Sequence, residues 1–150
     1  MIIRKLQKKH AKDVTRLVRD TFSEFVASSF SGKGSIDFLS QITEENISRF
    51  SEERDGYVAI SDSSVVGVIM SSQKKITCLF VDKRFQKKGI AAALTRKVET
   101  LFKKRGLKSI TCRSSLYAVP FYEKMGFKKT RGIVRHKLGF TYQPMKKELP

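Results

Sequence analysis

The stretch Leu79-Phe80-Val81-Asp82-Lys83-Arg84-Phe85-Gln86-Lys87-Lys88-Gly89-Ile90-Ala91-Ala92 leads from an apolar strand through a basic turn into a helix. The segment 76–81 is apolar on both alternating faces, as expected of a central strand covered on each side. Four of the six residues at 83–88 are cationic, and Gly89 and Ala91 leave room for a ligand close to the backbone. Because free N–H groups in the first turn of a helix bind anions, these residues favour a phosphate-binding turn. An ordinary strand-to-helix turn with a solvated run of charge is the alternative.

The elements that follow predict a parallel strand pair. The helix that begins near Gly89 has one apolar stripe and ends at Gly106, where a left-handed C-terminal cap belongs. A strand at 109–112 comes next, and the order strand, helix, strand implies a parallel pair with a right-handed connection. A short helix is expected at 119–125, with Pro120 in its first turn.

The remaining segments add strands at both ends of the chain and two helices before the first hairpin. The expected elements are a strand at 2–6, a helix at 11–26, a loop at 28–35, a weaker helix at 36–50, strands at 57–60 and 65–70, and two final strands around 140–141. The strands at 57–60 and 65–70 are close enough to form a hairpin. We therefore expect a single domain over residues 1–150, of the α/β or α+β class, with a mixed sheet and helices on both faces.

Composition and charge limit the kind of protein. The 31 Lys and Arg residues outnumber the 14 Asp and Glu residues and give a net charge of +17, which attracts polyanions and steers anionic ligands. No apolar run approaches the roughly 18 residues of a membrane span, and the charged start at 1–14 is unlike a signal peptide. Cys78 and Cys112 form neither a disulfide framework nor a metal site. We expect a cytoplasmic protein without a metal, and the absence of P-loop and dinucleotide fingerprints argues against a nucleoside triphosphatase or a Rossmann dehydrogenase.

Two segments resemble the landmarks of one enzyme family. Gln86-Lys87-Lys88-Gly89-Ile90-Ala91 matches the signature Gln/Arg-x-x-Gly-x-Gly/Ala of the GNAT superfamily of acyl-CoA-dependent N-acyltransferases. Pro120-Phe121-Tyr122-Glu123-Lys124-Met125-Gly126-Phe127 is similar to the second landmark of that family. The order of elements and the chain length also agree across nearly the whole chain. The resemblance implies a mostly antiparallel sheet whose central parallel strands splay apart to hold acetyl-CoA.

The resemblance also implies where the cosubstrate acetyl-CoA binds. Its pyrophosphate would lie on backbone amides of the signature turn, and its pantetheine arm would pair like an added strand with the strand before the turn. The residues implied are Leu79, Phe80, Val81, Lys87, Lys88, Gly89, Ile90, Ala91 and Ala92. A backbone amide near that strand would polarise the thioester carbonyl. Ser115 occupies the position where many members have an Asn that contacts CoA.

Tyr122 aligns with the tyrosine that gives a proton to the departing CoA thiolate in this family. A phenol within hydrogen-bond reach of the sulfur can supply that proton as the tetrahedral intermediate collapses. Judged without the resemblance, Tyr122 is better explained as a core residue whose hydroxyl touches solvent. The general base is less defined, because the strand at 76–81 has no carboxylate. His136, Glu44, Glu45 or a relay of water molecules are the alternatives.

The acceptor is the partner that the sequence defines least. Phe22, Phe25, Phe30 and Phe38 either pack in the core or line an acceptor pocket. We expect an N-acetyltransferase, a monomer or homodimer, in which a primary amine attacks acetyl-CoA directly in a ternary complex. A polyamine ranks lower as acceptor, since the basic surface would repel it. The alternative function is binding of RNA or another polyanion on the same scaffold, with little or no catalysis.

Overall fold

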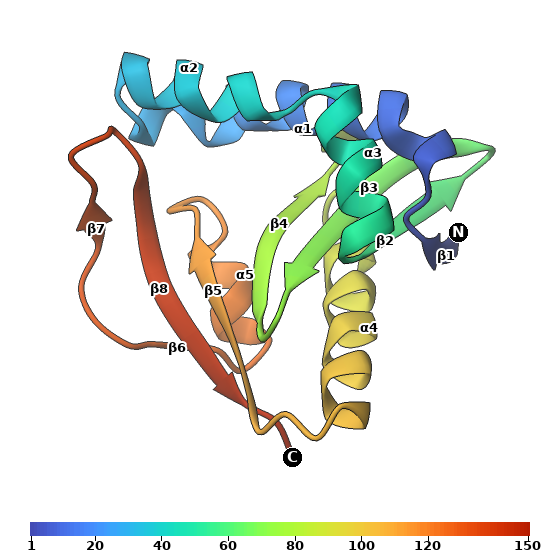
Figure 1. Cartoon of the computed structure of the whole chain (residues 1–150). Coiled ribbons are helices and arrows are strands. Elements are labelled where there is room, and N and C mark those ends of the chain that lie inside the picture. The colour runs from blue at the N-terminus through green and yellow to red at the C-terminus, as the bar shows by residue number, and fades with distance from the viewer.

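The computed structural model describes all 150 residues as an open sheet with helices on both faces (Figure 1). The strands lie in the order β1-β2-β3-β4-β5-β8-β6, and β7 pairs with β8 outside this path. The strands are β1 (Ile2–Lys5), β2 (Asp55–Ser61), β3 (Ser64–Ser72), β4 (Lys75–Val81), β5 (Ser109–Ser114), β6 (Lys128–Lys129), β7 (Val134–Arg135) and β8 (Thr141–Glu148). The helices are α1 (Ala11–Phe25), α2 (Gly32–Gln41), α3 (Glu44–Glu53), α4 (Ile90–Lys104) and α5 (Val119–Lys124), with short 3₁₀ helices at Lys8–His10, Ala27–Ser29 and Lys83–Phe85.

One strand pair is parallel and all other pairs are antiparallel. The parallel pair, β4 and β5, is joined only at Lys75↔Thr111 and Ile76↔Cys112. Beyond these residues the two strands diverge, and the gap between them widens toward α1 and α2 (Figure 1). The sheet therefore consists of two halves that meet at one end of β4 and β5. This confirms the predicted fold class, including the splayed parallel pair.

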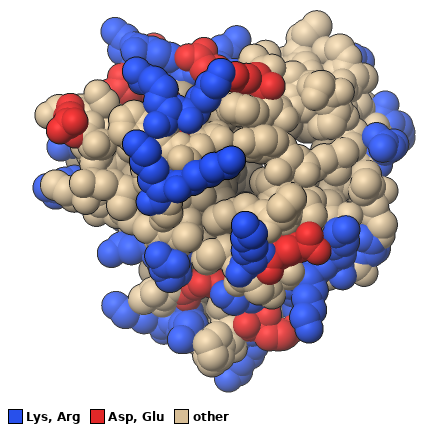
Figure 2. Space-filling model, turned by 180° about the vertical axis from the view of Figure 1, so that it is seen from behind, with Lys and Arg blue, Asp and Glu red and all other residues tan.

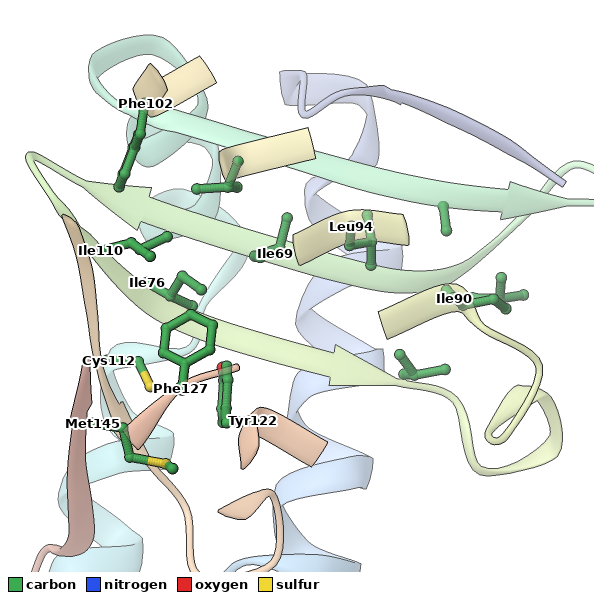
Figure 3. Packing of buried hydrophobic residues seen from close by; sticks show 14 residues of the cluster. Ile69, Ile76, Ile90, Leu94, Phe102, Ile110, Cys112, Tyr122, Phe127 and Met145 are labelled. Atoms are coloured by element: carbon green, nitrogen blue, oxygen red, sulfur yellow. The ribbon is translucent and has the colours of Figure 1, made fainter. Parts of the chain in front are cut away.

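Each face of the sheet carries its own apolar core. α4 and α5 cover one face, over a cluster that includes Leu94, Phe102 and Ile110 (Figure 3). α1 and α3 cover the other face, over a cluster that includes Val18 and Val58. All five of these side chains are fully buried. None of the helices combines the length and the hydrophobicity needed to cross a membrane.

The region before the first hairpin departs from the prediction, because α2 and α3 replace the expected loop and single weak helix over 28–50. The Ser31 side chain accepts a hydrogen bond from the Gly34 N–H (2.9 Å) and caps a helix that starts before its apolar residues do. The Thr43 side chain accepts one from the Asn46 N–H (3.1 Å) and starts a second helix. The prediction was wrong because it followed the apolar spacing and gave no weight to these two capping residues.

The other predicted elements are confirmed, with one addition. α4 runs between Gly89 and Gly106, whose φ angles of +82° and +78° place both glycines in the left-handed region. The hairpin of β2 and β3 is closed by Asp62 and Ser63, both with the positive φ that a tight hairpin turn requires. The two predicted final strands are β7 and β8, and the two-residue β6 adds a further antiparallel pair with β8.

β4 is a central strand, but it is not covered on both faces as predicted. Ile76 is buried, whereas the residues at 78–80 are only half-buried, because β5 turns away from β4 beyond Ile76. The register between β4 and β3 also shifts here, which leaves Thr77 as a bulge residue. The middle of β4 therefore faces the gap.

α2 is joined to the β7–β8 loop by a direct contact between backbones. The Ser31 N–H donates a hydrogen bond to the Gly139 carbonyl (3.1 Å). A Cβ atom at Gly34 would collide with the backbone of Gly139, and one at Gly139 would collide with Ser31 and Gly34. This glycine junction, Gly34 against Gly139, lets α2 close over the open end of the gap.

Candidate active site

The signature turn before α4 presents a row of unused hydrogen-bond donors. None of the backbone N–H groups from Lys87 to Ala92 donates to another group of the protein. Lys87 and Gly89 have positive φ angles of +62° and +82°, and Gly89 at the N-cap offers no side chain to satisfy the first amides. The dipole of this 15-residue helix adds to their positive potential. The six residues predicted at this turn thus form one run of amides suited to binding phosphate.

The shape of the turn is fixed by contacts on either side of it. The Asp82 carboxylate accepts a hydrogen bond from the Arg84 N–H (2.9 Å), and the Arg84 guanidinium holds the pKa of that carboxyl below its usual value. Gln86 donates through Nε2 to the Val81 carbonyl (3.1 Å) and accepts through Oε1 from the Tyr117 hydroxyl (2.8 Å). Tyr117 therefore ties the turn to the loop between β5 and α5. Sequence reasoning missed Tyr117, because nothing in its local pattern marks this contact.

β4 offers unpaired backbone groups to the gap. The Asp82 N–H donates to the Val66 carbonyl (2.8 Å), and this bond determines which residues of β4 point their backbone groups toward β3. By the alternation of antiparallel ladders, the backbone of Phe80 bonds to β3, whereas the N–H groups of Leu79 and Val81 point toward β5. Because β5 has diverged at this level, those two groups have no strand partner. Of the three strand residues predicted to pair with pantetheine, Leu79 and Val81 have free backbone N–H groups, while the Val81 carbonyl accepts a hydrogen bond from Gln86.

A cavity of about 100 Å³ lies in the gap between the two halves of the sheet. Its walls come from β4, β5, β8, α1, α2 and α5. Four of the predicted site residues line it, namely Leu79, Phe80, Ser115 and Tyr122. No carboxylate and no imidazole is among its lining side chains. The fold thus brings the predicted acid and the open edge of β4 into one space.

Tyr122 is held in the wall of this cavity by α5. Its ring packs edge-on against Phe121 and Phe127, with 5.3 and 5.1 Å between ring centroids, and only 4% of the residue is exposed. Figure 3 shows Tyr122 near Phe127 and Cys112. Burial raises the pKa of the Tyr122 phenol well above its usual value, and the nearby Cys112 and Cys78 thiols raise it further. The hydroxyl therefore stays protonated at neutral pH, as a proton donor must.

Ser115 lies at the start of the loop between β5 and α5. Its Oγ accepts a hydrogen bond from the Ala118 N–H (3.2 Å). The residue thus shapes the turn that leads into α5, and its own hydroxyl proton is left for a ligand in the cavity.

The two cysteines lie close to Tyr122 on β4 and β5. Cys112 is buried, but Cys78 is half-buried and lines the cavity, because β4 is uncovered at this point. Burial raises the pKa of the Cys112 thiol to about 12 and raises that of Cys78 more strongly. Since the thiolate is the reactive form, neither cysteine is activated as a nucleophile.

The candidate general bases lie outside the cavity. His136 is exposed in the loop between β7 and β8, where its Nδ1 accepts a hydrogen bond from the Leu138 N–H (3.1 Å). Glu44 and Glu45 are exposed at the start of α3, and Glu45 pairs with Arg49 at 3.4 Å. The structure therefore brings none of the three to Tyr122, and a base drawn from Asp, Glu or His is missing from the cavity wall.

A larger groove of about 410 Å³ lies between α1, the β2–β3 hairpin and the start of the signature turn. Its lining is mostly charged and includes Asp13, Asp20 and Glu24, the last paired with Lys83 at 2.7 Å. Phe25, one of the aromatic residues considered for an acceptor pocket, lines this groove rather than the cavity. The groove contains none of the predicted acetyl-CoA residues, so the smaller cavity is the candidate site.

Residues 26–149 match the family model for an acetyltransferase (GNAT) domain. The chain belongs to the GNAT acetyltransferase family. Uncharacterized protein YxbD of Bacillus subtilis (strain 168) is 31% identical to this GNAT protein over 105 residues, a match that spans 66% of this chain and 65% of YxbD.

Solved structures share the fold of this GNAT protein. A GCN5-related N-acetyltransferase from Rhodopseudomonas palustris is 17% identical, with a TM-score of 0.87 over 99% of this chain and 95% of that one. The PaiA N-acetyltransferase from Thermoplasma acidophilum, solved in complex with coenzyme A, is 19% identical, with a TM-score of 0.81 over 98% of each chain. At these identities the similarity concerns the fold alone.

Proposed function

We propose that this GNAT protein is an N-acetyltransferase that moves an acetyl group from acetyl-CoA to a primary amine. One observation carries the proposal: the free amides at 87–92 lie at the end of β4, whose open edge leads to the cavity that contains Tyr122. A ligand with a pyrophosphate, an extended amide-bearing arm and a terminal thioester matches this sequence of features. The likeness of the fold to a PaiA structure that contains coenzyme A supports the same class of ligand.

In the proposed reaction the amine and acetyl-CoA are bound together. The amine lone pair attacks the thioester carbonyl carbon, and a free N–H group at the open edge of β4 stabilises the resulting oxyanion. The intermediate collapses with cleavage of the C–S bond, and the Tyr122 hydroxyl donates its proton to the CoA sulfur. The proton lost by the attacking nitrogen passes to water, from which Tyr122 regains its own.

The lack of a base in the cavity wall determines the expected pH dependence. Because no carboxylate or imidazole is present to remove a proton, the acceptor has to react as the neutral amine. The net charge of +17 disfavours the protonated ammonium further. We therefore expect the rate to rise with pH until the acceptor amine is fully deprotonated.

Calorimetric titration with acetyl-CoA at near-physiological salt, with CoA and ATP as controls, tests the cosubstrate. Binding that prefers the CoA moiety over ATP is expected. Tyr122→Phe should still bind acetyl-CoA, while its turnover, measured by thiol release, falls by about 10²–10⁴. Tyr57→Phe is the matched control, since Tyr57 is a half-buried tyrosine on β2 outside the cavity. No acetyl-CoA binding by the folded protein, or unchanged turnover of Tyr122→Phe, would overturn the proposal.

The distribution of charge favours a second candidate function, the binding of RNA. Residues 76–150 contain 19 of the 31 Lys and Arg residues but only 4 of the 14 acidic residues, so this half of the chain carries +15 of the net charge of +17. Figure 2 shows Lys and Arg spread over the face of the molecule turned away in Figure 1. Such a surface predicts RNA affinity that falls steeply with salt concentration.

Charge reversal at two places on the chain tests this second candidate. Lys103→Glu/Lys104→Glu at the end of α4 should weaken RNA binding, measured by fluorescence anisotropy. The same reversal at Lys8 and Lys9, two exposed residues in the nearly neutral half of the chain, should change it little. Absent or salt-independent binding would rule this function out.

A further inference from the structure

The side of the cavity under α1 and α2 is walled by aromatic rings. Phe22 of α1 stacks on Phe38 of α2 with 4.2 Å between ring centroids. Phe30 meets these two rings edge-on at 5.2 and 6.2 Å, and Phe80 of β4 lies 6.5 Å from Phe38. All four line the cavity. The rings therefore pack against one another and also present an apolar surface to a bound molecule.

The same side of the cavity carries one charged side chain, Arg113 of β5. Because side chains alternate along a strand, Arg113 points away from Cys112 and Ser114, which are buried toward α4 and α5. Its guanidinium lies 5.2 Å from the centroid of the Tyr142 ring. Arg113 is exposed and makes no ion pair, so its charge is available to a ligand.

These walls discriminate between classes of amine. A polyamine binds through several ammonium groups, which need carboxylates, but the cavity offers a cation in their place. An apolar ring or branched chain gains from burial among the phenylalanines, and a carboxylate can pair with the forked N–H groups of Arg113. We propose that the acceptor is a small primary amine with an aromatic or branched apolar body and one carboxylate group. This inference rests on the acetyltransferase function proposed above.

Bound in this way, the proposed acceptor would place its amine on the side of the cavity where the thioester is expected. Its apolar body would lie between α1, α2 and β4, with its carboxylate near Arg113. Its amine would then face the gap, on whose other side Tyr122 and the open edge of β4 lie. The small volume of the cavity, about 100 Å³, favours a small molecule over a protein segment as the acceptor.

Three amines and two variants test the inference through thiol release from acetyl-CoA. Phenylalanine and phenethylamine differ only in the carboxylate, and spermidine represents the polyamines. We expect phenylalanine to have a kcat/KM at least about tenfold above that of phenethylamine, the effect of one charge-assisted hydrogen bond, with spermidine lowest. Arg113→Gln should raise KM for phenylalanine about tenfold or more and leave phenethylamine unchanged. Arg131→Gln removes an exposed arginine that does not line the cavity and should change neither value.

Other results would overturn the inference, and they show whether the acceptor class or the acetyl-CoA site is wrong. A higher kcat/KM for spermidine than for phenylalanine, or an equal effect of Arg113→Gln on phenylalanine and phenethylamine, contradicts the proposed acceptor class. If acetyl-CoA binds but none of the three amines is acetylated, the acceptor class is wrong while the cosubstrate site stands. If acetyl-CoA does not bind the folded protein, both the inference and the proposed function fail.

Discussion

The two glycines at the ends of α4 allow the role of the signature turn to be separated from its contribution to stability. Gly89 and Gly106 have φ angles of +82° and +78°, and a Cβ atom at either would meet nothing within 4 Å. Substitution by Ala therefore costs only the strain of a left-handed backbone, about 1–2 kcal/mol at each position. For a chain of this size that corresponds to a decrease in melting temperature of roughly 2–8 °C, similar for both variants.

The two variants should differ in acetyl-CoA affinity. Gly89 lies among the free amides at 87–92, so we expect even a small backbone adjustment to the strain there to move these amides out of alignment. Loss of one hydrogen bond to a charged phosphate weakens binding by about tenfold or more. Gly106 follows the other end of the same helix, so Gly106→Ala should keep the wild-type Kd.

Calorimetric titration at a temperature well below both melting transitions measures the two Kd values, and scanning calorimetry measures the two stabilities. An unchanged Kd for Gly89→Ala, or an equal loss of affinity in both variants, would refute the assignment of the turn as the pyrophosphate site. Unequal changes in melting temperature would refute the argument that both costs are purely backbone strain.

The remaining predictions concern the buried groups that join the two halves of the sheet. The Lys147 ammonium of β8 lies 2.6 Å from the Glu99 carboxylate of α4, so Lys147→Met leaves a buried carboxylate unpaired and should lower the free energy of unfolding by about 3–5 kcal/mol. The double variant with Glu99→Met should recover most of this loss. A urea titration that finds the single and the double variant equally unstable contradicts the prediction. Burial raises the pKa of the Cys112 thiol from 9.0 in the unfolded chain to about 12 in the folded chain. The protonated thiol therefore contributes fully to the free energy of unfolding below pH 9, and this contribution is lost as the pH rises toward 12. The urea midpoint should therefore fall between pH 8 and pH 10 by more in wild type than in Cys112→Val, and parallel pH profiles would disprove it.

Local determinants explain which elements could be predicted. Gly89, the apolar stripe of α4 and Gly106 specify where that helix begins, what it covers and where it stops, within a short segment of chain. The hairpin and the short helix with Pro120 are likewise encoded by neighbouring residues. The role proposed for Tyr122 was accessible only through the resemblance to a family, because a buried tyrosine by itself indicates a core position.

The features that the sequence did not reveal depend on distant partners. The contact between Gln86 and Tyr117 joins residues 31 positions apart. The exposure of β4 follows from the divergence of β5, and no property of the β4 residues themselves encodes it. The clustering of Phe22 with Phe80 and the placement of Arg113 beside them required the positions of α1, α2 and β5 in space. Sequence reasoning therefore named the residues proposed here for the cosubstrate and left the wall proposed for the acceptor undefined.

The glycine junction between α2 and the β7–β8 loop has a consequence for how this GNAT protein can be evolved. Each of the two positions is filled by the backbone of the other, so neither Gly34 nor Gly139 can accept a side chain while the other stays in place. Any first substitution has to separate α2, which carries the cavity residue Phe38, from the β7–β8 loop. A directed-evolution library at these two positions should therefore alter the wall of the cavity, where we propose that the acceptor binds, and leave the turn at 87–92 unchanged.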